Sequence, residues 1–166
     1  MISRPISNLG RVSLLLCFVA LSACDFDEPI SETPSREIDP QLLGTWQRGP
    51  DRFIITKGNR AVYNITGILE RSGRSGKREK IEGLMWHTAV GTSDFLILHT
   101  GYKILPYRYL TYRIKGDVAI VKPVQARGTK GTKFTEDTQG SVIDRINRHK
   151  NDKDFFAKEE VYTRIK

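Results

Sequence analysis

Short apolar runs alternate with polar positions along most of the chain after residue 40. These runs are separated by Gly, Asn and Asp and recur about every eight to twelve residues. Alternation of this kind places apolar and polar side chains on opposite faces of a strand. The pattern predicts a mainly β domain, a small antiparallel β-barrel or sandwich. The expected strands are residues 53–56, 61–66, 84–90, 95–99, 107–114 and 118–121.

Two of the connections have the composition of tight hairpins. Residues 57–60 read Lys-Gly-Asn-Arg, and residues 115–117 read Lys-Gly-Asp. Gly and Asn tolerate the positive φ angles that short primed turns require. We therefore expect those angles at Gly58 and Asn59 in the first turn and at Gly116 in the second.

One helix is expected to interrupt the strands, at about residues 138–150. Val142, Ile143 and Ile146 fall on one face of this helix, and Ser141 and Asp144 have the spacing of a capping box. We expect the helix to cover an open side of the sheet. A final strand at residues 161–165 then completes the domain.

The motif Gly44-Thr45-Trp46 lies at the start of the first expected strand. It resembles the G-x-W motif of lipocalins and related calycin-like barrels, which also carry a helix before their last strand. The resemblance implies that Gly44 permits a close turn and that Trp46 plugs the closed end of a barrel. It also implies that a basic residue of the last strand, here Arg164, lies across the indole, a favourable contact. Trp46 as a core residue of another small β fold is the alternative.

A different pattern occupies the N-terminal residues. Residues 12–23 form an apolar run that is shorter than the roughly 20 residues of a membrane-spanning helix, and it follows Arg4 and Arg11. The run ends in Leu-Ser-Ala-Cys at residues 21–24, which resembles the lipobox of bacterial lipoproteins. The resemblance implies cleavage before Cys24, acylation of its thiol, and residence in the bacterial cell envelope facing the periplasm. The resemblance does not decide between anchoring in the inner membrane and anchoring in the outer membrane.

Charge divides the rest of the chain into two parts. Residues 25–40 contain six acidic residues, one arginine and three prolines, which predicts an extended acidic tether. Residues 41–166 contain 24 lysines and arginines against 13 aspartates and glutamates. We therefore expect three segments: a signal peptide at residues 1–23, a tether at residues 24–40 and a basic barrel domain at residues 41–166.

Two basic clusters fall in expected loops, near residues 70–80 and 122–134. If both reach one end of the barrel, they form a cationic rim suited to an acidic ligand or a headgroup surface. Two solvated loops that keep the protein soluble are the alternative. The first cluster comprises Arg71, Arg74, Lys77, Arg78 and Lys80, and the second Lys122, Arg127, Lys130 and Lys133.

The reactive side chains favour no enzyme class. His87, His99 and His149 lack the spacing of metal ligands. Glu159 and Glu160 are adjacent, so a strand would point them to opposite faces and they could not act as a catalytic pair. We expect a protein that is not an enzyme, with no metal and no cofactor, and an exported chain does not meet nucleic acid.

Two functions of different class fit these features. In the first, the barrel interior binds a lipid or another small apolar or acidic ligand. In the second, the interior is filled by side chains, and the basic surface docks onto an envelope protein or an anionic polymer. For the first function, the expected lining residues are Tyr63, Trp86, Tyr109 and Tyr112.

Overall fold

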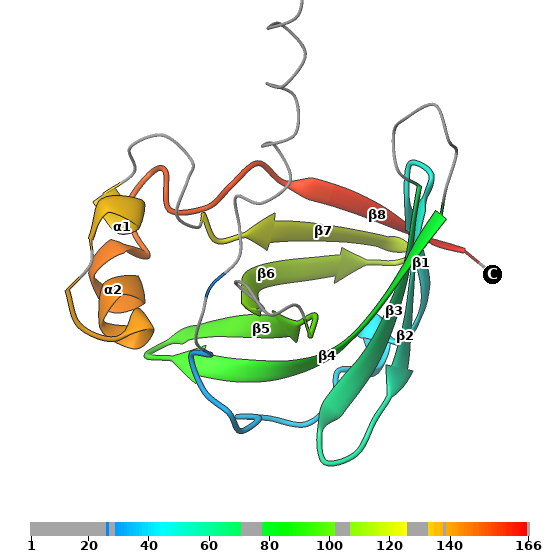
Figure 1. Cartoon of the computed structure of the whole chain (residues 1–166), viewed down its shortest axis with the longest axis horizontal. Helices are drawn as coiled ribbons and strands as arrows, with labels where there is room; N and C mark the ends of the chain where they lie inside the picture. The colour runs from blue at the N-terminus through cyan, green and yellow to red at the C-terminus, as the bar shows by residue number, and fades with distance from the viewer. Residues whose placement is uncertain are drawn as a thin grey trace, which may run out of the picture.

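A computed structural model describes residue 26 and residues 29–70, 78–101, 107–125, 133–137 and 139–165. Its elements follow one another around a barrel, with two short helices before the last strand (Figure 1). In chain order they are a 3-10 helix η1 (Pro40–Leu42), β1 (Gly44–Arg48), β2 (Asp51–Lys57), β3 (Val62–Glu70), β4 (Arg78–Val90), β5 (Ser93–His99), β6 (Tyr107–Lys115), β7 (Val118–Pro123), α1 (Lys133–Glu136), α2 (Val142–His149) and β8 (Glu160–Ile165).

The eight strands form a closed antiparallel barrel in which each strand pairs with its neighbours in the chain. Closure comes from the pairing of β1 with β8, with Trp46 opposite Arg164. This confirms the mainly β barrel with a helix before the last strand, and it is consistent with a lipocalin-like fold. Because the barrel is closed, each of the eight strands has a neighbouring strand on both sides.

Two apolar clusters lie on opposite faces of the sheet. One fills the barrel and includes Trp46, Tyr63 and Met85. The other lies outside the barrel, where Trp86 and Ile97 pack beneath residues of the helical segment. The second cluster explains why β4 and β5 carry four consecutive and three consecutive buried residues, respectively, in place of a strict alternation.

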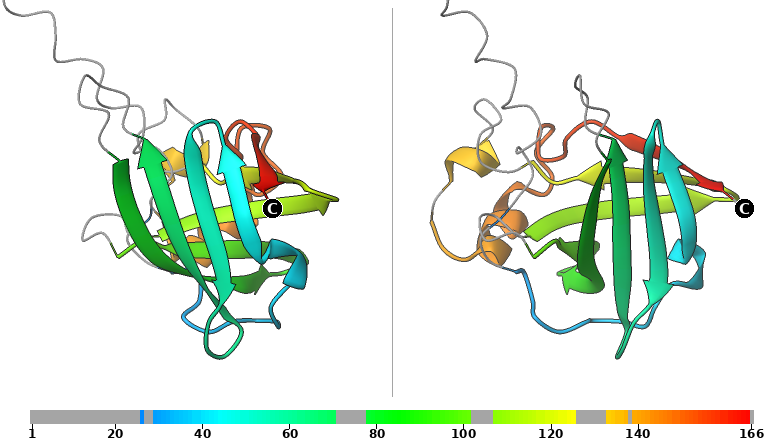
Figure 2. Two further views of the ribbon diagram at one scale, coloured as in Figure 1. Left: turned by 90° about the vertical axis from the view of Figure 1, so that its right-hand side faces the viewer. Right: turned by 45° about the vertical axis from the view of Figure 1, so that its right-hand side comes forward.

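The helix α2 begins at Ser141, and both hydrogen bonds of the expected capping box are present. It does not cover an open side of the sheet as expected, since the closed barrel has none. Val142 and Ile146 instead pack into the outer cluster, and Figure 2 shows α1 and α2 on the side of the barrel away from β1–β3. Arg148 and His149 of α2 both contact Asp137, which follows α1, at 2.7 and 2.9 Å.

Two local expectations differ from the structure. The positive φ angles of the β2–β3 turn belong to Arg60 and Ala61, whereas Gly116 has one as expected. The strand β4 begins at Arg78, six residues earlier than expected, because the long strand β3 supplies backbone partners as far as Glu70. Arg78 and Lys80 therefore lie on a strand and not in a loop.

The acidic segment also differs from the extended tether expected of it. We call Phe26 and residues 29–39 the strap, because they run along the outside of the barrel from one end to the other (Figure 1). Phe26 exchanges two backbone hydrogen bonds with Tyr107, and the Trp86 indole donates to the carbonyl of Ser31 at 2.8 Å. Residues 25–40 are mostly polar and charged, which suggested a solvated segment. Two apolar side chains among them, Phe26 and Ile30, are each only 5% exposed and attach the strap to the barrel.

We predict that Ile30→Ala lowers the free energy of unfolding by about 2–4 kcal/mol, because it leaves a cavity in the outer cluster. Val161→Ala, at a side chain that is 53% exposed, should cost less than about 1 kcal/mol. Urea unfolding of both variants measures the difference. Equal, small effects would mean that the strap contributes little to the fold.

Candidate functional site

One end of the barrel is closed around Trp46. The indole Nε1 donates to the carbonyl of Leu42 at 2.8 Å, and the Arg164 guanidinium carbon lies 4.4 Å from the ring centroid. Arg164 also donates to the carbonyls of Leu43 and Gln41, at 2.6 Å each. Gly44 has a φ of +125°, and a Cβ there would lie 3.1 Å from a guanidinium nitrogen. The structure thus brings Gly44, Trp46 and Arg164 together, and they hold η1 across this end.

A buried polar network lies just inside the closed end. His87 on β4 is fully buried, and its Nε2 lies 2.9 Å from the Tyr63 hydroxyl. Arg36 of the strap donates to its Nδ1 at 3.1 Å and to Asp94 at 2.9 Å. Because a guanidinium can only donate, Nδ1 accepts and the neutral ring carries its proton on Nε2.

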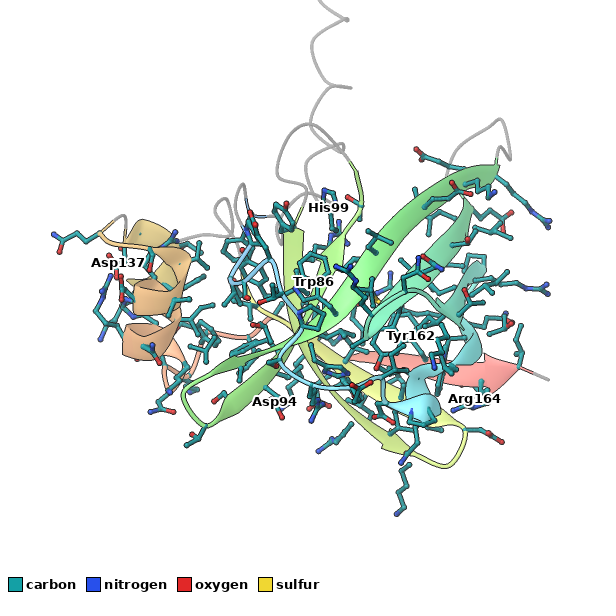
Figure 3. All side chains as sticks on the ribbon, turned by 90° about the horizontal axis from the view of Figure 1, so that it is seen from below. Trp86, Asp94, His99, Asp137, Tyr162 and Arg164 are labelled. Carbon is teal, nitrogen blue, oxygen red and sulfur yellow. The ribbon has the colours of Figure 1, made fainter. Side chains whose placement is uncertain are left out.

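Asp39 of the strap extends this network. Its backbone N–H donates to the Tyr63 hydroxyl at 2.6 Å, and its carboxylate accepts a hydrogen bond from Tyr112 at 2.8 Å. The side chains that would otherwise be unsatisfied in the interior are therefore bonded to the strap. Seen from below, the strap passes Trp86 and continues toward the part of the barrel that holds Arg164 (Figure 3).

The network favours uncharged rings. Burial, together with the neighbouring Arg36 cation, lowers the pKa of His87 to about 4, and Asp39 and Asp94 oppose the shift. Burial and the bond to Asp39 raise the pKa of the Tyr112 hydroxyl. Near neutral pH the imidazole and the phenol are both neutral. The imidazole has no exposed surface.

The four aromatic side chains expected to line a ligand site are divided between the two clusters. Tyr63 and Tyr112 contribute to the barrel interior, but Trp86 and Tyr109 belong to the outer cluster. Neighbouring strand residues face opposite sides of a sheet, and the sequence alone did not show which side was the interior. Tyr63, at 0% exposed, is among the largest fully buried side chains in the described residues.

The basic residues are described only in part. Arg71, Arg74, Lys77, Arg127 and Lys130 lie outside the described residues, as does Cys24. Of the rest, Arg78 and Lys80 are exposed on β4, with Lys80 paired to Glu82 at 2.6 Å. Lys133 is exposed at the start of α1, and Lys122 lies on β7.

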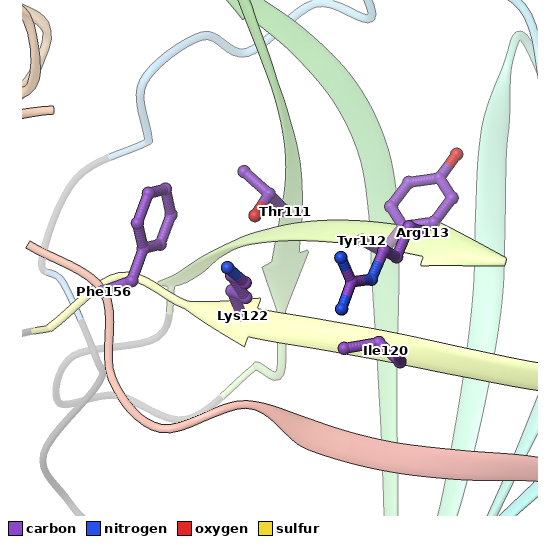
Figure 4. A pocket seen from close by; sticks show the side chains of 6 residues that line it. All are labelled: Thr111, Tyr112, Arg113, Ile120, Lys122 and Phe156. Atoms are coloured by element: carbon purple, nitrogen blue, oxygen red, sulfur yellow. The ribbon is translucent and has the colours of Figure 1, made fainter. Parts of the chain in front are cut away.

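Two open grooves lie on the outer surface of the barrel. One, of about 260 Å³, is bounded by the strap and by aromatic residues that include Trp86, His99 and Tyr107. The other, of about 270 Å³, lies over β6 and β7, where Lys122 lies between Phe156 and Arg113 (Figure 4). Both grooves lie outside the barrel interior.

Comparison with known proteins adds no assignment: no protein-family model, no curated protein and no solved structure matches the chain. Within the described ranges, no group of three or more His, Cys, Asp or Glu side chains could hold a metal ion. The part of the chain that the structure describes also has no helix long and apolar enough to cross a membrane.

The buried imidazole predicts a pH dependence of stability. As pH falls below about 6.5, the unfolded His87 gains a proton while the folded ring stays neutral until about pH 4. The free energy of unfolding should therefore fall over this interval, by at most about 3 kcal/mol, and should not depend on His87 above it. Urea unfolding from pH 7 to pH 4 tests this, with His87→Gln as the comparison. A variant that loses as much stability as the parent over the interval would contradict the prediction.

The closure around Trp46 gives a second prediction. Arg164→Met should lower the free energy of unfolding by about 2 kcal/mol or more, because it removes two charged hydrogen bonds and the contact with the indole. The matched variant Arg52→Met, at an exposed position of β2, should change it by less than about 0.5 kcal/mol. Thermal unfolding compares the two, and equal losses would argue against the closure.

Proposed function

We propose that this chain is a membrane-anchored envelope lipoprotein whose barrel is a non-catalytic docking module with its basic end facing the membrane. The observation that carries the proposal is the pairing of Phe26 with Tyr107. Tyr107 begins β6, at the end of the barrel opposite the closed end. Cys24, the acceptor in the lipobox-like sequence, is two residues from Phe26, a distance of about 7 Å in an extended chain. Acyl chains on Cys24 would hold that end against a bilayer.

The antiparallel topology supports a basic, membrane-facing end. β3 and β7 run in the same direction in the closed barrel. Both strands therefore finish at the same end of the barrel, at Glu70 and Pro123, and this is the end at which Phe26 meets Tyr107. The basic segments 71–77 and 126–132 follow these two strands in the chain. Each lysine or arginine near an anionic membrane surface contributes about 1 kcal/mol of attraction. We propose that these cations, with Arg78 and Lys80, orient the barrel on anionic headgroups.

Packing makes a ligand inside the barrel the less favoured alternative. The interior contains Trp46, Tyr63 and Met85, each at most 3% exposed, and the hydrogen-bonded strap crosses the closed end. Small barrels with such contents are filled by their own side chains. A filled interior is the premise of the second function expected from the sequence, in which the basic surface docks onto an envelope protein or an anionic polymer. We propose anionic headgroups as the surface that it meets.

We predict that residues 25–166, without the anchor, sediment with vesicles containing phosphatidylglycerol and not with vesicles of phosphatidylcholine alone. This chain keeps every residue of both apolar clusters, so we expect it to keep the described fold. Added salt should weaken the binding because the attraction is between surface charges.

Charge reversal tests which end docks. Arg71→Glu with Arg74→Glu should remove most of the binding. The matched pair Lys57→Glu with Lys115→Glu, at turns of the closed end, should remove little. An equal loss in both variants would contradict the proposed orientation, and binding that ignores salt would contradict docking through charge.

A further inference from the structure

From the groove over β6 and β7, we propose a binding site for a single-chain amphiphile with a carboxylate head, such as a fatty acid. Its lining combines two cations, Arg113 and Lys122, with the apolar side chains Ile120 and Phe156 and with Thr111 (Figure 4). The site contains no residue of the basic segments 71–77 and 126–132. It is therefore separate from the docking proposed above.

The two cations already share one carboxylate oxygen. Glu159 Oε1 lies 3.0 Å from the Lys122 ammonium and 3.7 Å from the Arg113 guanidinium, and Lys122 holds the pKa of Glu159 below its ordinary value. This geometry shows that both cations can reach a carboxylate at one position. Arg113 and Lys122 carry two positive charges, and Glu159 carries one negative charge. The site therefore keeps an excess of positive charge, and an incoming carboxylate can compete with Glu159 for it.

The positions beside the cations are apolar, although they lie on the outside of the barrel. Ile120 pairs across the strands with Val161, which is 53% exposed, and Val118 on the same face of β7 is 38% exposed. A solvent-facing strand surface is ordinarily polar. An alkyl chain laid along these side chains would remove their surface from water, which is favourable in proportion to the area covered.

Each half of the ligand therefore has its own partners on the protein. The carboxylate meets Arg113 and Lys122, and the chain meets Ile120 and Val161. A short anion such as acetate lacks the second set of contacts, and a neutral amphiphile lacks the first. Only a molecule with both parts uses the whole groove.

The test is a heteronuclear NMR titration of residues 25–166 with decanoate, below the concentration at which decanoate forms micelles. We expect saturable shifts in the amides of Thr111, Ile120 and Val161, with much weaker binding of acetate and of decyl glucoside. Shifts confined to the groove beside Trp86, or equal binding of decyl glucoside, would overturn the site.

A substitution of Glu159 is the most informative variant, because it is expected to strengthen decanoate binding. Glu159→Gln removes the competing carboxylate and should tighten decanoate binding about twofold to fivefold, the range for an exposed ion pair. Lys122→Gln should weaken binding by a similar factor, and Lys122→Gln with Arg113→Gln by about tenfold. Glu82→Gln, the same change in an exposed ion pair on β4, should have no effect.

Unchanged or weaker binding by Glu159→Gln would contradict a shared anion position. The titration uses no membrane, so its outcome is independent of the vesicle experiment. Loss of vesicle binding with intact decanoate binding would reject the docking proposal alone, and the reverse result would reject this site alone.

Discussion

The burial of His87 is the constraint on which the closed end of the barrel depends. An imidazole with no exposed surface must find hydrogen-bond partners inside the protein, because a buried polar group without one costs about 1–3 kcal/mol. Tyr63 on β3 provides one partner, and the other is Arg36, which is not part of the barrel. Without the strap, His87 Nδ1 would lose this partner, so the strap stabilises the closed end of the barrel.

The same requirement fixes the course of the N-terminal residues. Arg36 and Asp39 hold one end of the strap at the closed end, while Phe26 holds the other end at Tyr107. Between them the strap covers part of the outer cluster, where Ile30 is buried. A segment that looks like a flexible stalk is thus a structural part of the barrel, and its course determines where an anchor at Cys24 would emerge.

Local signals in the sequence predicted the parts of the fold that depend on local chemistry. The capping box at Ser141 and Asp144 and the glycine turn at Gly116 were identified from neighbouring residues alone. The contact between Trp46 and Arg164 was expected from a family resemblance, since no local pattern joins residues so far apart.

Features that depend on long-range pairing were missed. Trp86 lies outside the barrel and His87 inside it, but their adjacent positions do not show which face is the interior. The helical segment buries a second face of the sheet and so removes the alternation that would have shown it. Likewise, the charges of residues 25–40 suggested a solvated segment, whereas Arg36 and Asp39 form hydrogen bonds with His87 and Tyr112 of the barrel.

Hydrogen exchange at the amides of the strap tests its integration into the barrel most directly. The Ser35 N–H donates to the carbonyl of His87 at 2.8 Å, and the Phe26 N–H donates to that of Tyr107. If the strap is part of the folded unit, both amides should exchange as slowly as that of Val124, which bonds to Tyr109 in the barrel. Rapid exchange at Ser35 and Phe26 beside a protected Val124 would show that the barrel is stable without the strap and would contradict this account.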